Sequence, residues 1–403
     1  MAGVDSSYRG GTPSLLRSLN ARTVLELIEA AGPISRAEIA RRSGLSKPTV
    51  SLALNRLVES DIVREVGRSS GGRGPAAVLY QIDPSAGYVV GLDVGRRWLR
   101  VAVADLSGSM VARKERRSTT RSAHALLGRL DELVGDVLAE AGLSSAQVDR
   151  WVLGTPGVVR VGGRSLVLAP NLPGWGKPEV LSRLHERFGH VEVENDVNLA
   201  TLAEQRFGHG RDVDDFLVMS IGTGVGMGLV LNGQLYRGAN GAAGEIGYLP
   251  LGPGPLRRGS HEGRLEAETG SDAVVRHAHE LGMTGRLTAA TVFEAARAGD
   301  PVAQRVVDGE AERIGLALAS VVAVVDPALV VLGGGIGQSA DLLLKKVRAQ
   351  LNALSPMQPR CVVSALGEDA VLLGALATAR DLARDDLYRK ATNQPATLET
   401  KPA

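Results

Sequence analysis

Residues 216–231, FLVMSIGTGVGMGLVL, indicate how most of this chain folds. Two apolar runs of strand length lie at the ends of this stretch, and the glycine-rich loop 222–226 separates them. The earlier stretch 88–106 has the same arrangement of a dense apolar run, a short glycine-containing turn and a second strand with alternating character. A pattern that recurs in this way predicts two related α/β halves with a cleft between them.

A third glycine-rich turn, residues 333–337, follows a predicted strand over 328–332. Turns of this kind let backbone N–H groups approach an anion closely, because glycine has no side chain in the way. Each turn alone is a weak signal. Three of them on paired halves predict a cleft of the nucleotide-binding type.

The segment ENDVN, residues 194–198, is the first candidate for a ligand site, because it joins a predicted strand to a helix expected over 199–206. Carboxylates and amides at a strand end are well placed to bind vicinal hydroxyls, and a carboxylate there can also act as a general base. Glu245, in a glycine-rich loop, and Glu266, at a helix start, add two further acids.

The N-terminal 84 residues have a different pattern, that of short helices joined by a tight turn. Ser35 followed by Glu38 is a capping-box sequence that opens one helix, and Gly44 supplies the left-handed residue that ends it. Ser46, with a proline two residues later, opens the next helix, whose core-facing stripe is Val50, Leu54 and Leu57. Two short helices joined by a glycine turn predict a helix-turn-helix.

Two predicted strands, 62–66 and 76–82, follow these helices and flank a loop rich in glycine and arginine. They form the hairpin of a winged helix, whose loop would lie against a phosphate backbone. The side chains expected to contact DNA are on the outward helix face and in the wing: Lys47, Thr49, Ser51, Leu52, Asn55, Arg56, Arg68 and Arg73. The alternative interpretation of the same caps and turn is a helical module that binds protein.

The composition is that of a globular chain with more than one domain: 403 residues, 44% hydrophobic and 22% charged, with a net charge of +2. No apolar stretch approaches the ~18–20 residues that a transmembrane helix needs, and the N-terminus lacks the apolar core of a signal peptide. The single cysteine, Cys361, excludes a disulfide framework and a cysteine-based zinc site. We therefore expect a cytoplasmic protein with no membrane contact.

The order of several motifs resembles the ROK family, named for repressors, open reading frames and kinases. In chain order the motifs are Asp93 with Gly95, GTPG at 154–157, NLPGW at 171–175, END at 194–196, GTG at 222–224, GEIG at 244–247 and Leu265-Glu266. The resemblance covers roughly residues 85–385, and with a winged helix ahead of it the chain looks like the repressor branch, the sugar-responsive regulators of bacterial catabolism. It implies a two-lobed actin-like ATPase fold, as in hexokinases, with a sugar bound between the lobes.

The resemblance also implies roles for the matching positions. Sugar contacts would come from Asn171, Asn195, Asp196, Glu245, Tyr248 and Glu266. In the family's kinases the position of Asp196 is the base that deprotonates the attacking hydroxyl. The remnants of the nucleotide loops would be Asp93, Gly95, Gly222, Thr223, Gly224 and Gly334. No cofactor is expected.

Two departures from the family pattern bear on catalysis and on metal binding. The kinases have Gly-Gly-Thr-Lys after the first aspartate-containing strand, whereas this loop is Gly95-Arg96-Arg97-Trp98, whose large side chains should keep ATP phosphates away. The family's zinc ligands, a histidine and three cysteines, are replaced by Tyr248, Arg257, Gly259 and Arg264. His261 alone cannot hold zinc, so no structural metal is expected.

The identity of the sugar stays open, because the histidine that Tyr248 replaces also touches the sugar in the family. Three arginines nearby, Arg257, Arg258 and Arg264, form either a solvated turn or an anion site that would favour a phosphorylated sugar.

The expected organisation is a multidomain α/β protein with four parts: a flexible arm (1–16), a winged helix-turn-helix domain (17–84), a two-lobed ROK domain (85–385) and a disordered tail (386–403). The predicted function is that of a sugar-responsive transcription regulator, most simply a repressor. Its expected partners are double-stranded operator DNA, a sugar or sugar phosphate, and further copies of itself in a homodimer or a dimer of dimers.

Two alternatives remain open at this point. One is an ATP-dependent sugar kinase that carries a DNA-binding regulatory domain, in which Asp196 would be catalytic. The other is a sugar-binding scaffold whose N-terminal module contacts protein.

Overall fold

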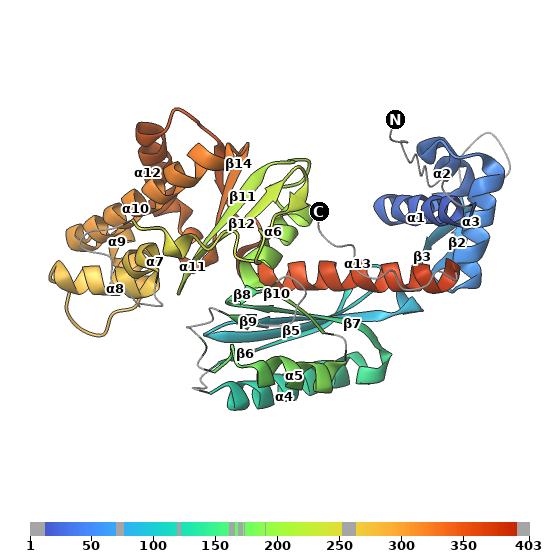
Figure 1. The fold of residues 1–403 in the computed structure, drawn as a ribbon, viewed down its shortest axis with the longest axis horizontal. Helices are drawn as coiled ribbons and strands as arrows, with labels where there is room; N and C mark the ends of the chain where they lie inside the picture. The colour runs from blue at the N-terminus through green and yellow to red at the C-terminus, as the bar shows by residue number, and fades with distance from the viewer. Residues whose placement is uncertain are drawn as a thin grey trace, which may run out of the picture.

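The computed structural model describes residues 13–69, 76–118, 122–160, 166–167, 172, 174–189, 191–251 and 263–392. These residues form a small N-terminal domain and two lobes (Figure 1). Each lobe is built on a five-stranded mixed sheet. No helix within these ranges combines the length and the apolar character that crossing a membrane requires.

The N-terminal domain is a winged helix-turn-helix, as predicted. Its elements are α1 (Pro13–Ala31), β1 (Ile34–Ser35), α2 (Arg36–Ser43), α3 (Lys47–Glu59), β2 (Val63–Arg68) and β3 (Val78–Ile82), with strand order β1-β3-β2. Ser35 caps α2 by accepting the N–H of Glu38, and Gly44 ends the helix at φ +69°. The capping box is only half formed, because the Glu38 carboxylate accepts hydrogen bonds from Arg41 and Arg42 instead of turning back to the cap.

Lobe 1 contains β4 (Tyr88–Val94), β5 (Trp98–Asp105), β6 (Met110–Arg117), β7 (Val148–Thr155) and β10 (Val191–Asn195) in the order β10-β7-β4-β5-β6. The first three strands form an antiparallel meander, and β7 and β10 add to it in parallel. Helices α4 (Ala123–Ala141) and α5 (Pro178–Phe188) cover one face of this sheet, and α13 (Ala370–Thr392) covers the other (Figure 1).

Lobe 2 has the same topology with different strands. Its sheet contains β11 (Phe216–Ile221), β12 (Val225–Leu231), β13 (Gln234–Leu235), β14 (Leu329–Gly333) and β15 (Arg360–Val363) in the order β13-β12-β11-β14-β15. Again three strands form an antiparallel meander and two add in parallel. The predicted pair of related halves is therefore present.

The helices of lobe 2 are α7 (Arg264–Glu268), α8 (Ser271–Glu280), α9 (Ala289–Arg297), α10 (Pro301–Val325), α11 (Gly334–Gly337) and α12 (Ala340–Leu354). A small hairpin of β8 (Val158–Val159) and β9 (Leu166–Val167) lies beside lobe 1.

Two helices connect these parts. The helix α6 (Asp196–Phe207) packs against α13 so closely that a Cβ on Gly374 would lie 1.9 Å from the carbonyl oxygen of Leu199. The helix α13 runs from the junction of the lobes to the N-terminal domain (Figure 1). Ile28 of α1 belongs to the same buried apolar cluster as Leu376 and Ala379 of α13, so the N-terminal domain shares a core with lobe 1.

The expected ends of the ordered chain need correction at both sides. The helix α1 already begins at Pro13, inside the arm expected over 1–16, and α13 continues to Thr392, inside the tail expected over 386–403. Tertiary contacts explain the longer C-terminal helix, because Leu387 packs on the shared core and Asp386 pairs with Arg150 of β7. Residues 1–12 and 393–403 lie outside the described ranges.

Candidate functional site

The outward face of α3 carries six of the eight side chains predicted to contact DNA. The helix is fixed from within, because Val50, Leu54 and Leu57 are buried in the domain core, and Ser46 caps it by accepting the N–H of Thr49. Lys47, Leu52 and Asn55 are exposed, and Thr49, Ser51 and Arg56 are half-buried. The side chain of Leu52 is exposed on the same face as Lys47 and Asn55, where an apolar side chain can meet a thymine methyl group.

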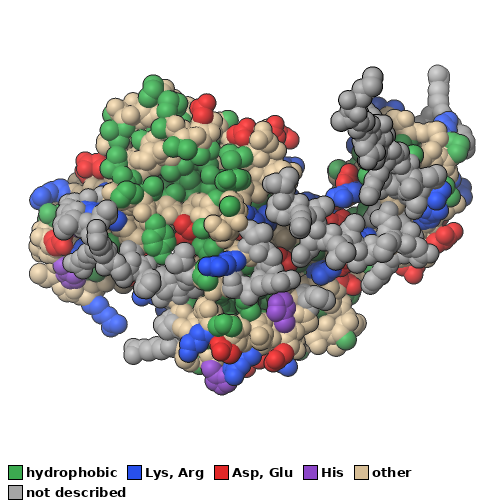
Figure 2. Space-filling model, in the orientation of Figure 1, with side chains coloured by type: hydrophobic (Ala, Val, Ile, Leu, Met, Phe, Trp, Pro, Cys, Tyr) green, Lys and Arg blue, Asp and Glu red, His purple; other side chains and the backbone are tan. Residues whose placement is uncertain are grey.

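The wing supplies the other two predicted side chains. Arg68 is exposed at the end of β2, and Arg73 lies outside the described residues. Basic side chains are visible along the outer edge of the N-terminal domain, over α3 and β2 (Figure 2). The structure therefore presents a helix with small polar and basic side chains next to an arginine-bearing hairpin, both directed away from the lobes.

A cleft of about 360 Å³ separates the two lobes. It brings together all the described residues predicted to hold a sugar: Asn195, Asp196, Glu245, Tyr248 and Glu266. Every predicted remnant of the nucleotide loops lines the same cleft: Asp93, Gly95, Gly222, Thr223, Gly224 and Gly334. Asn171 lies outside the described residues, so its predicted place over the cleft has no structural counterpart here.

The start of α6 supplies the lobe 1 side of the site. Asn195 is the N-cap, because its Oδ1 accepts the N–H of Asn198 at 3.0 Å while its Nδ2 donates to the Gly157 carbonyl at 3.0 Å. The helix therefore begins at Asp196, three residues earlier than the sequence pattern predicts. Burial raises the pKa of Asp196 to about 6, even though its carboxylate accepts the N–H of Val197.

Lobe 2 faces Asp196 with two more carboxylates. Glu266 Oε2 accepts the N–H of Val225 at 3.1 Å, which holds this side chain at the cleft wall. Burial, with the nearby charges of Asp196 and Glu266, raises the pKa of Glu245 to about 7. Tyr248 stands half-exposed at the edge, and burial with the same acidic surroundings raises its pKa. Three carboxylates around one space favour a ligand that donates hydrogen bonds.

Among the predicted nucleotide-loop residues the cleft contains a cation, Arg100, that sequence analysis missed. Arg100 lies opposite Asp93 in the β4–β5 ladder and donates to its carboxylate at 3.0 Å, and its second Nη donates to Glu368 at 2.6 Å. Burial raises the pKa of Asp93 to about 6, although the charge of Arg100 acts to lower it. The sequence did contain a signal for this ion pair. Arg100 lies inside an otherwise apolar strand, and a buried charge needs a partner of opposite charge.

The loop after β4 places its three large side chains, Arg96, Arg97 and Trp98, in the lining of the cleft. Arg96 and Arg97 are exposed, and Arg96 reaches across to Asp272 of α8 with an Nη–Oδ distance of 3.4 Å. Ser271 beside it donates from both its N–H and its hydroxyl to the Gly222 carbonyl. The loop thus contributes a long, exposed ion pair between the lobes. The buried partner of Asp93 is Arg100 of β5 and not a residue of this loop.

Some of the positions that replace the family's zinc ligands lie outside the described residues. Tyr248 and Arg264 are described, but positions 257, 258, 259 and 261 lie outside the described residues. Within the described ranges, no group of three or more His, Cys, Asp or Glu side chains could hold a metal ion.

Comparison with known families identifies both parts of the chain. Residues 89–382 match the family described as "ROK family". The chain belongs to the ROK family. Residues 17–64 match the family described as "Winged helix-turn-helix DNA-binding". The predicted resemblance and the predicted fold class are therefore confirmed.

This ROK protein is similar to two curated regulators over most of its length. It is 27% identical to the xylose repressor of Caldicellulosiruptor bescii, over 91% of this chain and 96% of that protein. It is 26% identical to the DNA-binding transcriptional dual regulator NagC of Escherichia coli K12, over 85% of this chain and 86% of that protein.

Solved structures show the same fold. A ROK family transcriptional regulator described as a homologue of the E. coli MLC protein superposes with a TM-score of 0.78 at 24% identity, over 94% of this chain and all of that chain. A ROK family glucokinase from Streptomyces griseus, solved with glucose and AMPPNP, gives a TM-score of 0.63 at 28% identity, over 73% of this chain and all of that chain.

Proposed function

We propose that this ROK protein is a sugar-responsive transcription regulator of carbohydrate metabolism, most simply a repressor. Operator DNA would be bound by α3 and the wing, and a sugar in the interlobe cleft would alter that binding. The observation that carries the proposal is the combination of an outward-facing α3 with a cleft walled by three carboxylates in one chain. The xylose repressor and NagC, which resemble the chain over 85% or more of its length, support this assignment.

The ligand that this cleft favours is a neutral monosaccharide. Asp196, Glu245 and Glu266 would accept hydrogen bonds from sugar hydroxyls, and Asn195 and Tyr248 would complete the contacts. Asn171, which lies outside the described residues, remains a predicted further contact. A cleft of about 360 Å³ is in the range of small-molecule sites and suits a ligand of this size. The negative charge of the three acids argues against an anion in the same place, so a phosphorylated sugar would have to direct its phosphate toward Arg96 and Arg97.

The ion pair that Asp93 forms with Arg100 supports a regulator that does not transfer phosphoryl groups. Such transfer needs Mg²⁺ and open loops to neutralise the phosphates. Here the carboxylate of Asp93 is already paired with the buried Arg100 guanidinium, which itself contacts Glu368 and Glu115. A cation that belongs to the protein thus stands on the nucleotide side of the cleft, and we infer that ATP and its metal are not bound there.

One observation favours the kinase alternative. Asp196 stands at the position of the family's base, and its raised pKa of about 6 is suitable for accepting a proton near neutral pH. A coupled ATPase assay with pentoses and hexoses separates the two functions. Turnover that Asp196→Asn abolishes would establish the kinase, and no turnover above the rate without enzyme is expected.

We further propose a homodimer, or a dimer of dimers, located in the cytoplasm with its operator. A helix-turn-helix gains affinity and spacing specificity from two half-sites. Hydrophobic side chains gather on the visible face of lobe 2 (Figure 2), and Leu316 and Val324 of α10 are exposed. Sedimentation of the protein at micromolar concentration tests the oligomer directly.

Two measurements test the proposed function. Fluorescence anisotropy with a DNA fragment from the region upstream of its own gene should give tighter binding than a random fragment, and one sugar should change that affinity. A thermal-shift panel of D-xylose, D-glucose, N-acetyl-D-glucosamine and their phosphates identifies the sugar, because a ligand of the folded state raises the melting temperature.

Glu245→Gln tests the cleft assignment in the same panel. The loss of a charged acceptor should weaken sugar binding by about 10- to 100-fold, while Glu280→Gln on the surface of α8 serves as the control. Equal binding by wild type and Glu245→Gln would refute the assignment.

A further inference from the structure

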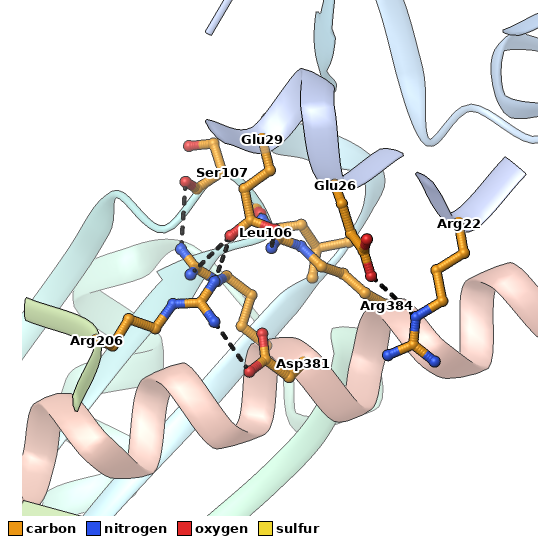
Figure 3. A network of polar contacts seen from close by, with 9 residues as sticks. Arg22, Glu26, Glu29, Leu106, Ser107, Arg206, Asp381 and Arg384 are labelled. Atoms are coloured by element: carbon orange, nitrogen blue, oxygen red, sulfur yellow. Dashed lines mark hydrogen bonds and ion pairs between the residues drawn. The ribbon is translucent and has the colours of Figure 1, made fainter. Parts of the chain in front are cut away.

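We propose that an ion cluster between α1, α6 and α13 is the joint through which the sugar cleft controls the DNA-binding domain. The cluster consists of Glu29, Arg206, Arg380, Asp381 and Arg384 (Figure 3). This inference rests on the proposed function, since it assigns a mechanism to the regulation of DNA binding by the sugar.

Glu29 connects three helices from three parts of the molecule. It lies near the end of α1 in the DNA-binding domain, and its Oε1 accepts from Arg206 of α6 at 2.5 Å and from Arg380 of α13 at 3.0 Å. Its Oε2 pairs with Arg384, one turn further along α13. Arg206 also donates to Asp381 at 3.2 Å. Because one carboxylate binds both α6 and α13, its contacts depend on the relative position of these helices.

The centre of the cluster is charged and largely removed from water, whereas Asp381 at its edge is exposed. The side chains of Arg380 and Arg384 are only 10% and 6% exposed, and that of Glu29 is 24% exposed. Three guanidiniums face two carboxylates, and the Nε atoms of Arg380 and Arg384 have no hydrogen-bond partner among the described residues. Burial and the neighbouring Arg384 lower the pKa of Arg380 to about 10. Loss of Glu29 from the cluster would leave buried like charges facing one another, which is strongly unfavourable.

The helix α6 connects this cluster with the cleft in a single rigid element. Asp196, a proposed sugar ligand, is its first residue, and Arg206 is in its last turn. A helix of this length spans about 18 Å and transmits a displacement from end to end. A sugar that bridges Asp196 to Glu245 and Glu266 would therefore act on the same helix that holds Glu29.

The helix α6 contacts both α13 and lobe 2. Near its start Leu199 lies in backbone contact with Gly374 of α13, and further along Glu204 accepts a hydrogen bond from Ser364 of lobe 2 at 2.5 Å. Thr201 lies against Gly228 of lobe 2, where a Cβ would be 1.9 Å from its Oγ1. Since α6 packs along α13 and also touches lobe 2, a change in the angle between the lobes would act on α6 and through it on the contacts of Arg206 with α1 and α13.

The second connection to the cleft runs through α13. Ala370 and Val371, in its first turn, line the cleft, and Arg380 and Arg384 lie about three turns further on. The guanidinium of Arg380 also donates to the Ser107 carbonyl. Arg384 donates to the Leu106 carbonyl in the turn after β5 (Figure 3). These bonds attach α13 to lobe 1, whereas Arg206 belongs to the helix that also contacts lobe 2, so the cluster joins groups that depend on both lobes.

Glu29→Gln tests the joint with a side chain of the same shape and no charge. The quantity measured is the ratio of the operator dissociation constants with and without the sugar that the thermal-shift panel selects from D-xylose, D-glucose and N-acetyl-D-glucosamine. We expect this ratio to move toward one by about 2- to 30-fold relative to wild type. The sugar should still raise the melting temperature, because the cleft is unchanged.

Glu26→Gln is the matched control. Glu26 lies one turn earlier on α1 and is 62% exposed, and its ion pair with Arg22 at 3.1 Å is also exposed. The control should keep the wild-type ratio. A merely structural role of Glu29 would lower the melting temperature and weaken DNA binding equally with and without sugar, leaving the ratio unchanged, and that result overturns the proposal.

Arg206→Gln provides a second test, which also decides the matter if Glu29→Gln does not fold. Arg206 is 34% exposed at the end of α6, so the fold should tolerate its substitution more easily than that of Glu29. Arg206→Gln should also move the ratio of the dissociation constants toward one. In a double-mutant cycle the effects of the two substitutions on the logarithm of the ratio should not add, because both substitutions remove the same contact, between Glu29 and Arg206. A wild-type protein that binds DNA and sugar with a ratio of one refutes the proposed function, whereas a wild-type ratio retained by both variants refutes only the joint.

Discussion

Arg100 and Asp93 face each other in the register of β4 and β5, with 3.0 Å between Nη1 and Oδ2. Both side chains are at least nine-tenths buried, so each depends on the other for a counter-charge. The pair lines the cleft among the predicted nucleotide-loop residues, and in the proposed function it is the feature that argues most directly for a sensor over a phosphotransferase.

Removal of this cation should destabilise the fold. Arg100→Met leaves Asp93 buried without its partner, and loss of one member of such a pair lowers the free energy of unfolding by about 3–5 kcal/mol. Adding Asp93→Asn should restore part of the loss. Urea unfolding measures both variants, with the exposed Arg97→Ala as a control within about 0.5 kcal/mol of wild type. A loss in Arg100→Met no larger than that of the control would contradict the ion-pair argument.

The acidic cleft should make stability fall as the pH rises. Glu245 titrates near 4.5 when unfolded and near 7 when folded, so between these values the folded state binds more protons than the unfolded state. Its stabilising effect is complete below about pH 4.5 and is lost as the pH passes through 7. Asp196, with a pKa raised to about 6, acts in the same direction. The melting temperature of wild type minus that of Glu245→Gln should therefore decrease between pH 5 and pH 8.

The control for this pH series is Glu280→Gln, because Glu280 is exposed and pairs only loosely with Arg276 at 3.5 Å. Its melting-temperature difference from wild type should not vary with pH. A constant difference for Glu245→Gln would show that the three carboxylates do not share a buried site.

Two residues of α3 should affect DNA binding in different ways. Asn55→Ala should weaken binding to the specific fragment by about 5- to 150-fold and leave random DNA unaffected, because an amide in the major groove reads a base. Arg56→Ala, if its guanidinium grips a phosphate, should weaken both and reduce the slope of log affinity against log salt by about one. Anisotropy titrations at several salt concentrations measure both effects, with Arg297→Ala in lobe 2 as the control.

Two glycine-to-alanine substitutions, one at the contact between α6 and α13 and one in α4 as a control, test this packing. Gly374→Ala places a methyl group 1.9 Å from the Leu199 carbonyl oxygen and should lower the free energy of unfolding by about 1–3 kcal/mol or more. Gly135→Ala in α4 meets nothing within 4 Å and should instead stabilise the protein by about 0.5–1 kcal/mol, since alanine is the better helix former. Effects of equal sign in the two variants would contradict the packing seen here.

Several features of the fold could be predicted because their causes are local. The caps at Ser35 and Ser46, the left-handed Gly44 and the apolar stripe of α3 each depend on residues a few positions apart. The early start of α6 was also open to prediction, because Asn195 is a favourable N-cap and its side chain needs only the N–H of Asn198.

The sequence by itself determined the helix-turn-helix, the pair of related halves and the acidic candidates Asp196, Glu245 and Glu266, because periodicity, capping and glycine positions act over short distances along the chain. Only the tertiary structure decided which charges meet. Glu29 and Arg206 are 177 positions apart, and Arg100 and Glu368 are 268 apart. A charged side chain carries no local signal for a partner so far away, because the pairing depends on how whole helices and sheets pack. The extension of α13 to Thr392 has the same cause, since contacts with β7 and the shared core stabilise turns that propensity alone leaves undecided.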